Sequence, residues 1–453
     1  MADAPEFQSL RALHAAYRAG RADPVAVAQQ CLERARAAEP GLFTCLLEAR
    51  ALTEAQASRA RWQAGQPLGP LDGVPVVWKD LFDVAGTPTT AASALRRHAP
   101  PAARDAAAVA ALCAAGAVSI GKTGLTEFAY SGLGLNPHFG TPRNRHSRDG
   151  HRAPGGSSSG SAVAVDAGMA LIGMGTDTGG SVRIPAAFNG LVGFKPSIGR
   201  INSTGVFPLS ATLDVIGPMA RSVQDCAWTY QALLGLATPD LQPPPLNTLR
   251  LVVPTNVVLD EAQPGVLARF EAVLAQLRAA GARVEHLHIP AFDALQALTG
   301  PHGTIPAAEA YVLHRDIVDG PDAARLDPRV LARIQRGATM MASDLVVLQQ
   351  ARARLMAQTL ALLGDAWLLF PTVVHVAPLV APLDADVALF NQTNLRTLRN
   401  TALLNVLDWG GVSLPMGQGE AGMPLGLLVS GPAGTEDALL GVAAALEALL
   451  AEG

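Results

Sequence analysis

The chain has 453 residues, of which 49% are hydrophobic and 16% are charged. A chain of this length can bury a large core, and its charged fraction lies well below the quarter that is usual for globular domains. The formal net charge is −4, and no block of lysine or arginine stands out. This balance argues against a nucleic-acid-binding surface, which would usually be basic.

The cysteines and the apolar segments point to a reduced compartment and away from a membrane. None of the four cysteines forms a CxxC pair, so neither a zinc ribbon nor a redox motif is indicated. The N-terminus lacks the basic start and apolar run of a signal peptide. The uncharged, alanine-rich stretch at residues 106–121 is shorter than a membrane span needs. We therefore expect a cytoplasmic protein with no membrane contact.

The first third of the chain predicts helices followed by an alternation of strands and helices. Apolar residues recur near helical spacing through the first 65 residues, which we expect to be helical. From Gly69 the pattern changes, and GVPVVWKD reads as a short buried strand. Residues 106–116 read as a helix, and AVSIGKT after them as a second strand. This alternation favours a largely parallel or mixed sheet covered by helices.

The rest of the chain continues the predicted alternation of strands and helices. We expect a helix at 223–234, a linker at 239–245, and a strand–helix–strand unit formed by LRLVVP, residues 266–280 and RVEHLHI. Residues 299–360 are helical in pattern without a recognisable motif. WLLFPT, GVSLPMG and MPLGLLVSG predict short strands, and a terminal helix follows. The predicted fold class is α/β: one large domain, residues 1–453, with a central mixed β-sheet covered by helices on both faces.

Residues 155–185 hold two glycine-framed serines, Ser157 and Ser181. Glycine lets a backbone approach a reacting atom closely, so both serines are suited to nucleophilic chemistry. A flexible linker is the first alternative, but small apolar residues follow the segment directly. A phosphate-binding loop would need G-x-x-x-x-G-K, which is absent. A nucleophile elbow would need a strand directly before Gly156, and RNRHSRDGHRAPG does not predict one.

The TDTGGSVRIP segment has the composition of an oxyanion-binding loop. Successive N–H groups around Gly179, Gly180 and Ser181 could converge on one oxygen. A glycine-rich turn that serves only packing is an equally good explanation when the segment is considered alone. The nearby Ser157 and Lys79 favour the functional interpretation.

Lys79 lies among apolar residues, where a charged lysine is disfavoured. To act as a base near neutral pH, its pKa would have to fall by about 3 units from about 10.4, which costs about 4 kcal/mol. Burial of the Lys79 side chain beside hydroxyl groups can lower its pKa by this amount. The alternative is an ion pair with the neighbouring Asp80 that keeps Lys79 charged. A Ser-His-Asp triad and metal catalysis find no support, since no histidine has a special setting and no HExxH occurs.

The segment from Gly155 to Pro185 closely resembles the signature of the amidase signature family of Ser–Ser–Lys hydrolases. The resemblance extends to GPLDGVPVVWKDLFDVAGTPTTAAS, GKTGLTEFAYSG and the C-terminal strands, and covers roughly residues 5–235 and 360–450. The region 65–235 carries the motifs, whereas 236–359 matches only in general character. Within the latter, we expect residues 295–360 to form a helical substrate-pocket region. Three positions depart from the usual pattern: Gly124, Ser159 and Asp166.

The resemblance implies roles for individual residues. Ser181 would be the acylated nucleophile, and Ser157, preceded by a cis peptide bond, would relay protons to the base Lys79. The oxyanion hole and its supports would be formed by residues of one loop: the N–H groups of Thr178, Gly179, Gly180 and Ser181, braced by Asp177 and Arg183. No metal or organic cofactor is implied.

The expected function is hydrolysis of the C–N bond of small amides, aryl amides or carbamates. The glutaminase subunit of a tRNA-dependent amidotransferase shares this signature and is the alternative; a non-enzymatic accessory subunit fits less well with three intact catalytic residues. The expected partners are a small-molecule amide and neither nucleic acid nor membrane, with a homodimer as the assembly to test. We expect the substrate pocket to be lined by Tyr130, Ser131 and Gly132, the 202–207 loop, and residues of 299–345 and 395–410.

Overall fold

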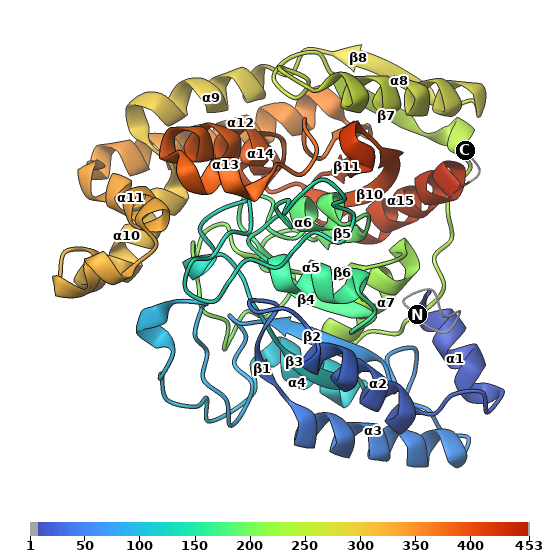
Figure 1. The fold of residues 1–453 in the computed structure, drawn as a ribbon. Helices are drawn as coiled ribbons and strands as arrows, with labels where there is room; N and C mark the ends of the chain where they lie inside the picture. The colour runs from blue at the N-terminus through green and yellow to red at the C-terminus, as the bar shows by residue number, and fades with distance from the viewer. Residues whose placement is uncertain (1–7, 452–453) are drawn as a thin grey trace.

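The computed structural model of the protein describes residues 8–451 and is built around one mixed sheet of eleven strands. The sheet order is β1-β3-β2-β4-β6-β5-β10-β11-β9-β7-β8. Helices flank the sheet (Figure 1), which confirms the predicted fold class. The strands are β1 (Phe43–Leu46), β2 (Pro75–Lys79), β3 (Val118–Thr123), β4 (Ile172–Asp177), β5 (Val192–Lys195), β6 (Val215–Ala220), β7 (Arg250–Pro254), β8 (Arg283–Leu287), β9 (Trp367–Pro371), β10 (Gly410–Gln418) and β11 (Pro424–Gly431).

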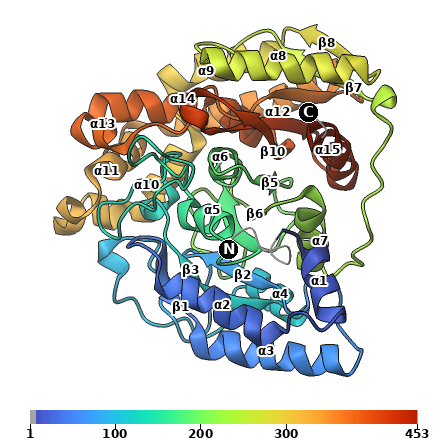
Figure 2. The ribbon, with the colours of Figure 1, turned by 45° about the vertical axis from the view of Figure 1, so that its right-hand side comes forward.

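The strand pairings join the two ends of the chain in one sheet. β2 runs parallel to both β3 and β4, while β6, β5, β10, β11 and β9 follow in antiparallel pairs. β7 is parallel to both β9 and β8. Figure 2 shows α2 (Pro24–Arg36) and α3 (Glu48–Gln63) at one end of the sheet and α8 (Pro264–Ala279) at the other. The C-terminal strands β10 and β11 thus lie in the middle of the sheet, and the main hydrophobic core runs from Leu10 to Leu446.

Fifteen α-helices occur within residues 8–451. Those of the regions 305–335 and 380–406 lie on the left of both views (Figures 1 and 2). The helices are α1 (Leu10–Arg18), α2 (Pro24–Arg36), α3 (Glu48–Gln63), α4 (Ala107–Ala114), α5 (Ser159–Asp166), α6 (Arg183–Phe188), α7 (Val223–Leu233), α8 (Pro264–Ala279), α9 (Pro290–His302), α10 (Ile305–Val318), α11 (Pro328–Gln335), α12 (Ala342–Leu363), α13 (Val380–Ala385), α14 (Val387–Val406) and α15 (Glu436–Ala451).

Local sequence explains most of these elements. Asp23 caps α2 by accepting hydrogen bonds from two N–H groups of its first turn, and Pro24 occupies the position where a missing N–H costs nothing. The prediction that the first 65 residues are helical is wrong at Phe43–Leu46, because this stretch pairs antiparallel with β3 as an edge strand. No described helix is long and apolar enough to cross a membrane.

Candidate active site

The sheet brings the lysine and the serine segments together at one edge. Val76, Val77 and Trp78 are fully buried in β2, as expected for a strand with parallel neighbours on both sides. Lys79 ends this strand, and Asp177 ends the adjacent β4. Because β2 and β4 are parallel, their carboxyl ends lie at the same edge, where ligand sites of α/β sheets form.

The Lys79 amino group is held by two hydroxyl groups. Its Nζ donates to Ser157 Oγ at 2.7 Å and to Thr176 Oγ1 at 2.7 Å, and the side chain is fully buried. No carboxylate of the described residues forms an ion pair with it. Asp80 instead pairs with Lys122 at 2.6 Å, so the alternative in which Asp80 keeps Lys79 charged is wrong.

Burial lowers the pKa of Lys79 from 10.5 to about 7, because desolvation disfavours the ammonium form. The negative charges of Asp214 and Asp177 oppose this effect without cancelling it. Near neutral pH a large fraction of Lys79 is therefore an uncharged amine. Such an amine can accept a proton from the hydroxyl group that it contacts, which is the requirement for a general base.

The segments of Ser157 and Ser181 lie against each other. The N–H of Ser158 donates to the carbonyl oxygen of Ser181 at 3.3 Å, and the peptide bond between Gly156 and Ser157 is cis. Ser157 is fully buried, whereas Ser181 is 5% exposed and lines a cavity. No hydrogen bond joins Ser181 Oγ to another described residue. Ser181 is thus the member of the Lys79–Ser157–Ser181 set that faces the cavity.

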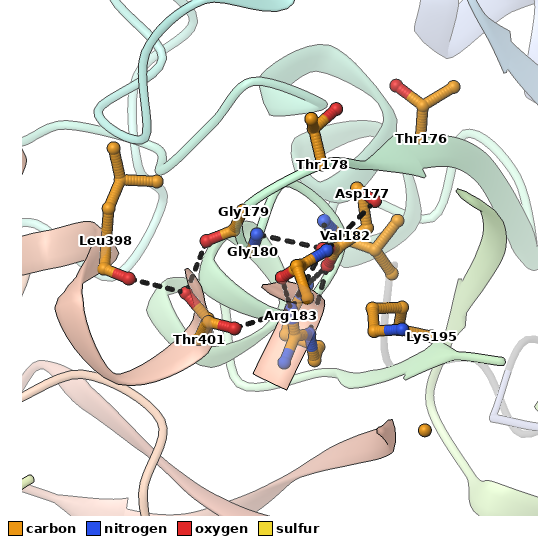
Figure 3. Close-up of polar contacts among 12 residues, drawn as sticks. Thr176, Asp177, Thr178, Gly179, Gly180, Val182, Arg183, Lys195, Leu398 and Thr401 are labelled. Carbon is orange, nitrogen blue, oxygen red and sulfur yellow. Dashed lines mark hydrogen bonds and ion pairs between the residues drawn. The ribbon is translucent and has the colours of Figure 1, made fainter. Parts of the chain in front are cut away.

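The loop between β4 and α6 is organised by one buried carboxylate, as Figure 3 shows. Asp177 accepts hydrogen bonds from the N–H groups of Gly180 at 2.8 Å and Val182 at 3.1 Å. Its carboxylate also pairs with Arg183, with Nη2 2.9 Å and Nε 3.0 Å away. Burial alone would raise the pKa of Asp177, but the Arg183 guanidinium holds it below its usual range. These contacts place Asp177 and Arg183 behind the loop as supports.

The bond to Asp177 corrects one expectation about the oxyanion hole. The N–H of Gly180 is already engaged, so it is not a free donor for a developing oxyanion. Among the described residues, no acceptor binds the N–H groups of Thr178, Gly179 or Ser181. Gly180 still requires glycine, because its φ is +130° and a Cβ there would lie 2.1 Å from Thr401 Oγ1.

Several supporting residues were not anticipated from the sequence. Thr176 supplies the second acceptor for Lys79. Asp214 accepts a hydrogen bond from Thr178 Oγ1 at 2.5 Å and from the N–H groups of Leu209 and Ser210, and burial raises its pKa. The carboxylate of Asp214 thereby anchors Thr178. A buried carboxylate directly before a strand was the available signal, although its partner depends on the tertiary fold.

Helix α14 supports the same loop from the other side. Thr401 Oγ1 donates to the carbonyl oxygen of Gly179 at 2.6 Å, and Asn405 Nδ2 donates to Asp177 Oδ1 at 2.9 Å. Asn405 Oδ1 in turn accepts from Arg183 at 2.5 Å. The C-terminal part of the chain is therefore in direct contact with the glycine-rich loop.

The cavity at Ser181 has a volume of about 680 Å³. Its walls come from the 129–131 loop, the 178–181 loop, residues 209 and 213, α9, the start of α10, and α14, with Arg333 of α11 and Leu348 of α12. Tyr130 and Ser131 line it, whereas Gly132 does not. A Cβ at Gly132 would meet the side chain of Leu398, and the Gly132 N–H donates to Asn394 Oδ1 at 2.8 Å.

The loop 202–207 also lies outside the cavity wall, contrary to expectation. Phe207 stacks instead on Phe128 and His314, with ring centroids 5.9 and 5.8 Å apart. Burial lowers the pKa of His314 and of His375 to about 4. None of the described histidines forms a hydrogen bond with Ser157 or Ser181.

Comparison with known proteins places the chain in a family. The Amidase family model matches residues 26–440. A 2-amino-5-chloromuconic acid deaminase of Comamonas testosteroni is 37% identical over 442 residues, covering 95% of this chain and 93% of the relative. A glutamyl-tRNA(Gln) amidotransferase subunit of Symbiobacterium thermophilum is 40% identical over 298 residues, covering 62% of this chain and 60% of the relative.

A solved structure described as a crystal structure of amidase superposes with a TM-score of 0.84 at 32% identity, covering 97% of this chain and 99% of the other. The chain belongs to the Amidase family, and it is an enzyme of the class that hydrolyses C–N bonds.

Proposed function

We propose that the chain hydrolyses small amides through an acyl-enzyme on Ser181, with Ser157 as the proton relay and Lys79 as the base. One observation carries this proposal: a buried lysine with a pKa lowered to about 7 contacts Ser157 Oγ at 2.7 Å, next to a serine that faces the cavity. A nucleophilic serine needs such a base, since its hydroxyl group is weakly nucleophilic when protonated.

The first half of the reaction forms the acyl-enzyme. Uncharged Lys79 takes a proton from Ser157 Oγ, which takes the proton of Ser181 Oγ as this oxygen attacks the amide carbonyl carbon. The N–H groups of Thr178, Gly179 and Ser181 stabilise the resulting oxyanion. A single donor of this kind contributes about 10²- to 10³-fold to kcat.

The second half releases both products. Ser157 passes a proton to the amide nitrogen, the C–N bond breaks, and Lys79 returns its proton to Ser157. Water then attacks the ester on Ser181 and gives its proton to the same relay. The carboxylic acid leaves, and Ser181 regains its hydroxyl proton.

A glutaminase that serves an amidotransferase is the second candidate, because the amidotransferase relative is 40% identical over 298 residues. The share of the two chains that aligns there, 62% and 60%, is lower than for the deaminase relative. The cavity wall offers one carboxylate, Glu261, as a counter-charge for the ammonium group of glutamine. The cytoplasmic location and the homodimer expected from the sequence stay predictions.

The test is hydrolysis of a panel of neutral primary amides, aryl amides and glutamine by the wild-type protein and by Ser181→Ala, Ser157→Ala and Lys79→Met. We expect turnover of at least one amide, and a loss of at least about 10³-fold in each variant. Thr339→Ala is the control, because this exposed threonine lies outside the cavity wall. Turnover that survives in all three variants would contradict the proposed mechanism.

A further inference from the structure

The charged groups in the wall of the cavity are mostly cationic. Three arginines line it, namely Arg333, Arg396 and Arg399, and Glu261 is the acidic residue among the lining residues. Much of the remaining wall is apolar and comes from leucine, isoleucine, proline and alanine side chains. A substrate that enters this space therefore meets hydrocarbon and positive charge.

Two of these arginines already have partners. Arg396 Nη2 donates to the carbonyl oxygen of Glu261, and Arg396 Nε lies 3.9 Å from the Glu261 carboxylate. Arg399 Nη2 donates to the carbonyl oxygen of Asp260 at 2.5 Å. Both guanidinium groups thus tie α14 to the 260–261 segment.

Arg333 has no such partner among the described residues. Within residues 8–451 no carboxylate forms an ion pair with it and no acceptor is bonded to its guanidinium group, whose Nε is shielded from solvent. The guanidinium group lies over the ring of Tyr130, 4.7 Å from the centroid. Arg329, one turn earlier in α11, has two carboxylates within 2.9 Å.

The Arg333 guanidinium group has five donors and no acceptor at the wall of the cavity. It is partly removed from water, so its position carries an unfavourable desolvation free energy in the protein without substrate. Burial and the neighbouring Arg336 lower the pKa of Arg333, which reflects the same cost. A bound carboxylate would offset this desolvation free energy, since guanidinium and carboxylate form two parallel hydrogen bonds. Tyr130, on which the Arg333 guanidinium group lies, lines the same cavity as Ser181.

Resting on the proposed function, we propose that the substrate is an amide that also carries a carboxylate, held by Arg333, with an apolar segment between the two groups. In the simplest case it is a half-amide of a dicarboxylic acid. Water then replaces the amide nitrogen through the ester on Ser181, ammonia leaves, and the products are a dicarboxylate and an ammonium ion. Arg333 touches the substrate away from the reacting bond and determines specificity.

The test compares kcat/KM for the half-amides of glutaric and adipic acid with that for neutral amides in which a methyl group replaces the carboxylate. We expect the wild type to prefer the half-amides, and Arg333→Gln to lower this preference by about 10- to 100-fold. Arg333→Lys should restore part of it. Arg336→Gln is the matched control, because Arg336 is exposed on the next turn and lies outside the cavity wall.

An equal rate on charged and neutral amides, or an Arg333→Gln variant with the wild-type preference, would overturn the proposal while leaving the amidase mechanism intact. If no amide of either kind is hydrolysed, the proposed function fails. Calorimetric titration with glutarate then tests, independently of catalysis, whether Arg333 forms an anion-binding site. Binding that Arg333→Gln abolishes and Arg336→Gln retains supports the site, and absence of binding to the wild type refutes it.

Discussion

The proposed base, Lys79, is expected to make activity depend on pH in a specific way. The structure lowers the pKa of Lys79 from 10.5 to about 7, a change equivalent to roughly 5 kcal/mol in proton affinity. In the proposed mechanism, the uncharged amine is the active form. Below pH 7, kcat/KM for a neutral amide should therefore fall about tenfold for each pH unit, and above pH 8 it should reach a plateau.

The chain offers an unusually direct assay for this pKa. It contains only three lysines, Lys79, Lys122 and Lys195, and all three are fully buried. Labelling lysine with ¹³C at Cε gives three signals, which the variants Lys79→Met and Lys195→Met assign. We expect the Lys79 signal to titrate near pH 7 and the Lys195 signal near pH 8, because burial lowers the pKa of Lys195 to about 8.

The kinetic and spectroscopic midpoints should coincide within about one pH unit. A Lys79 signal that titrates above pH 10, together with activity that still rises up to that pH, would refute the burial argument. A kcat/KM that stays constant from pH 5 to 8 would refute the role of Lys79 as base, even if its pKa were low.

Other predictions concern the residues around Lys79 and the packing of its segment. Asp214→Asn removes a negative charge that raises the pKa of Lys79, so the acidic limb of the pH–rate profile should move to lower pH; an upward move would contradict this assignment. Lys79→Met should be more stable than the wild type at pH 7, by at most about 4 kcal/mol in urea unfolding. The unfolded state binds the extra proton between pH 7 and 10.5, so wild-type stability rises with pH there and the difference should shrink; a constant difference would exclude this linkage. Gly124→Ala would place a Cβ 2.0 Å from the Gly41 carbonyl oxygen and should destabilise the protein by about 1–3 kcal/mol. Gly300→Ala, on an exposed helix face where an added Cβ would meet open space, should not destabilise it.

The sheet and the candidate catalytic segments were predictable because their signals are local. The apolar run before Lys79 requires burial on both faces, and the glycines around Ser157 and Ser181 mark close backbone approaches. β1 was missed because four residues carry too little pattern, and its pairing with β3 is a tertiary contact.

The contacts that complete the site depend on segments that are distant in sequence. Thr176 reaches Lys79 only because β2 and β4 are neighbours in the sheet, 97 positions apart in the chain. Thr401 and Asn405 meet the glycine-rich loop across more than 220 positions. Arg333 lies in a helical region without a motif, and its lack of a partner among the described residues is visible only when the whole cavity wall is known.

The most direct test of the account is the mass of the intact protein after exposure to a fluorophosphonate, followed by peptide mapping. We expect one adduct, located on Ser181, that is absent from Ser181→Ala and forms much more slowly in Lys79→Met. An adduct on another residue, or labelling of Ser181→Ala at the wild-type rate, would contradict the assignment of Ser181 as the nucleophile.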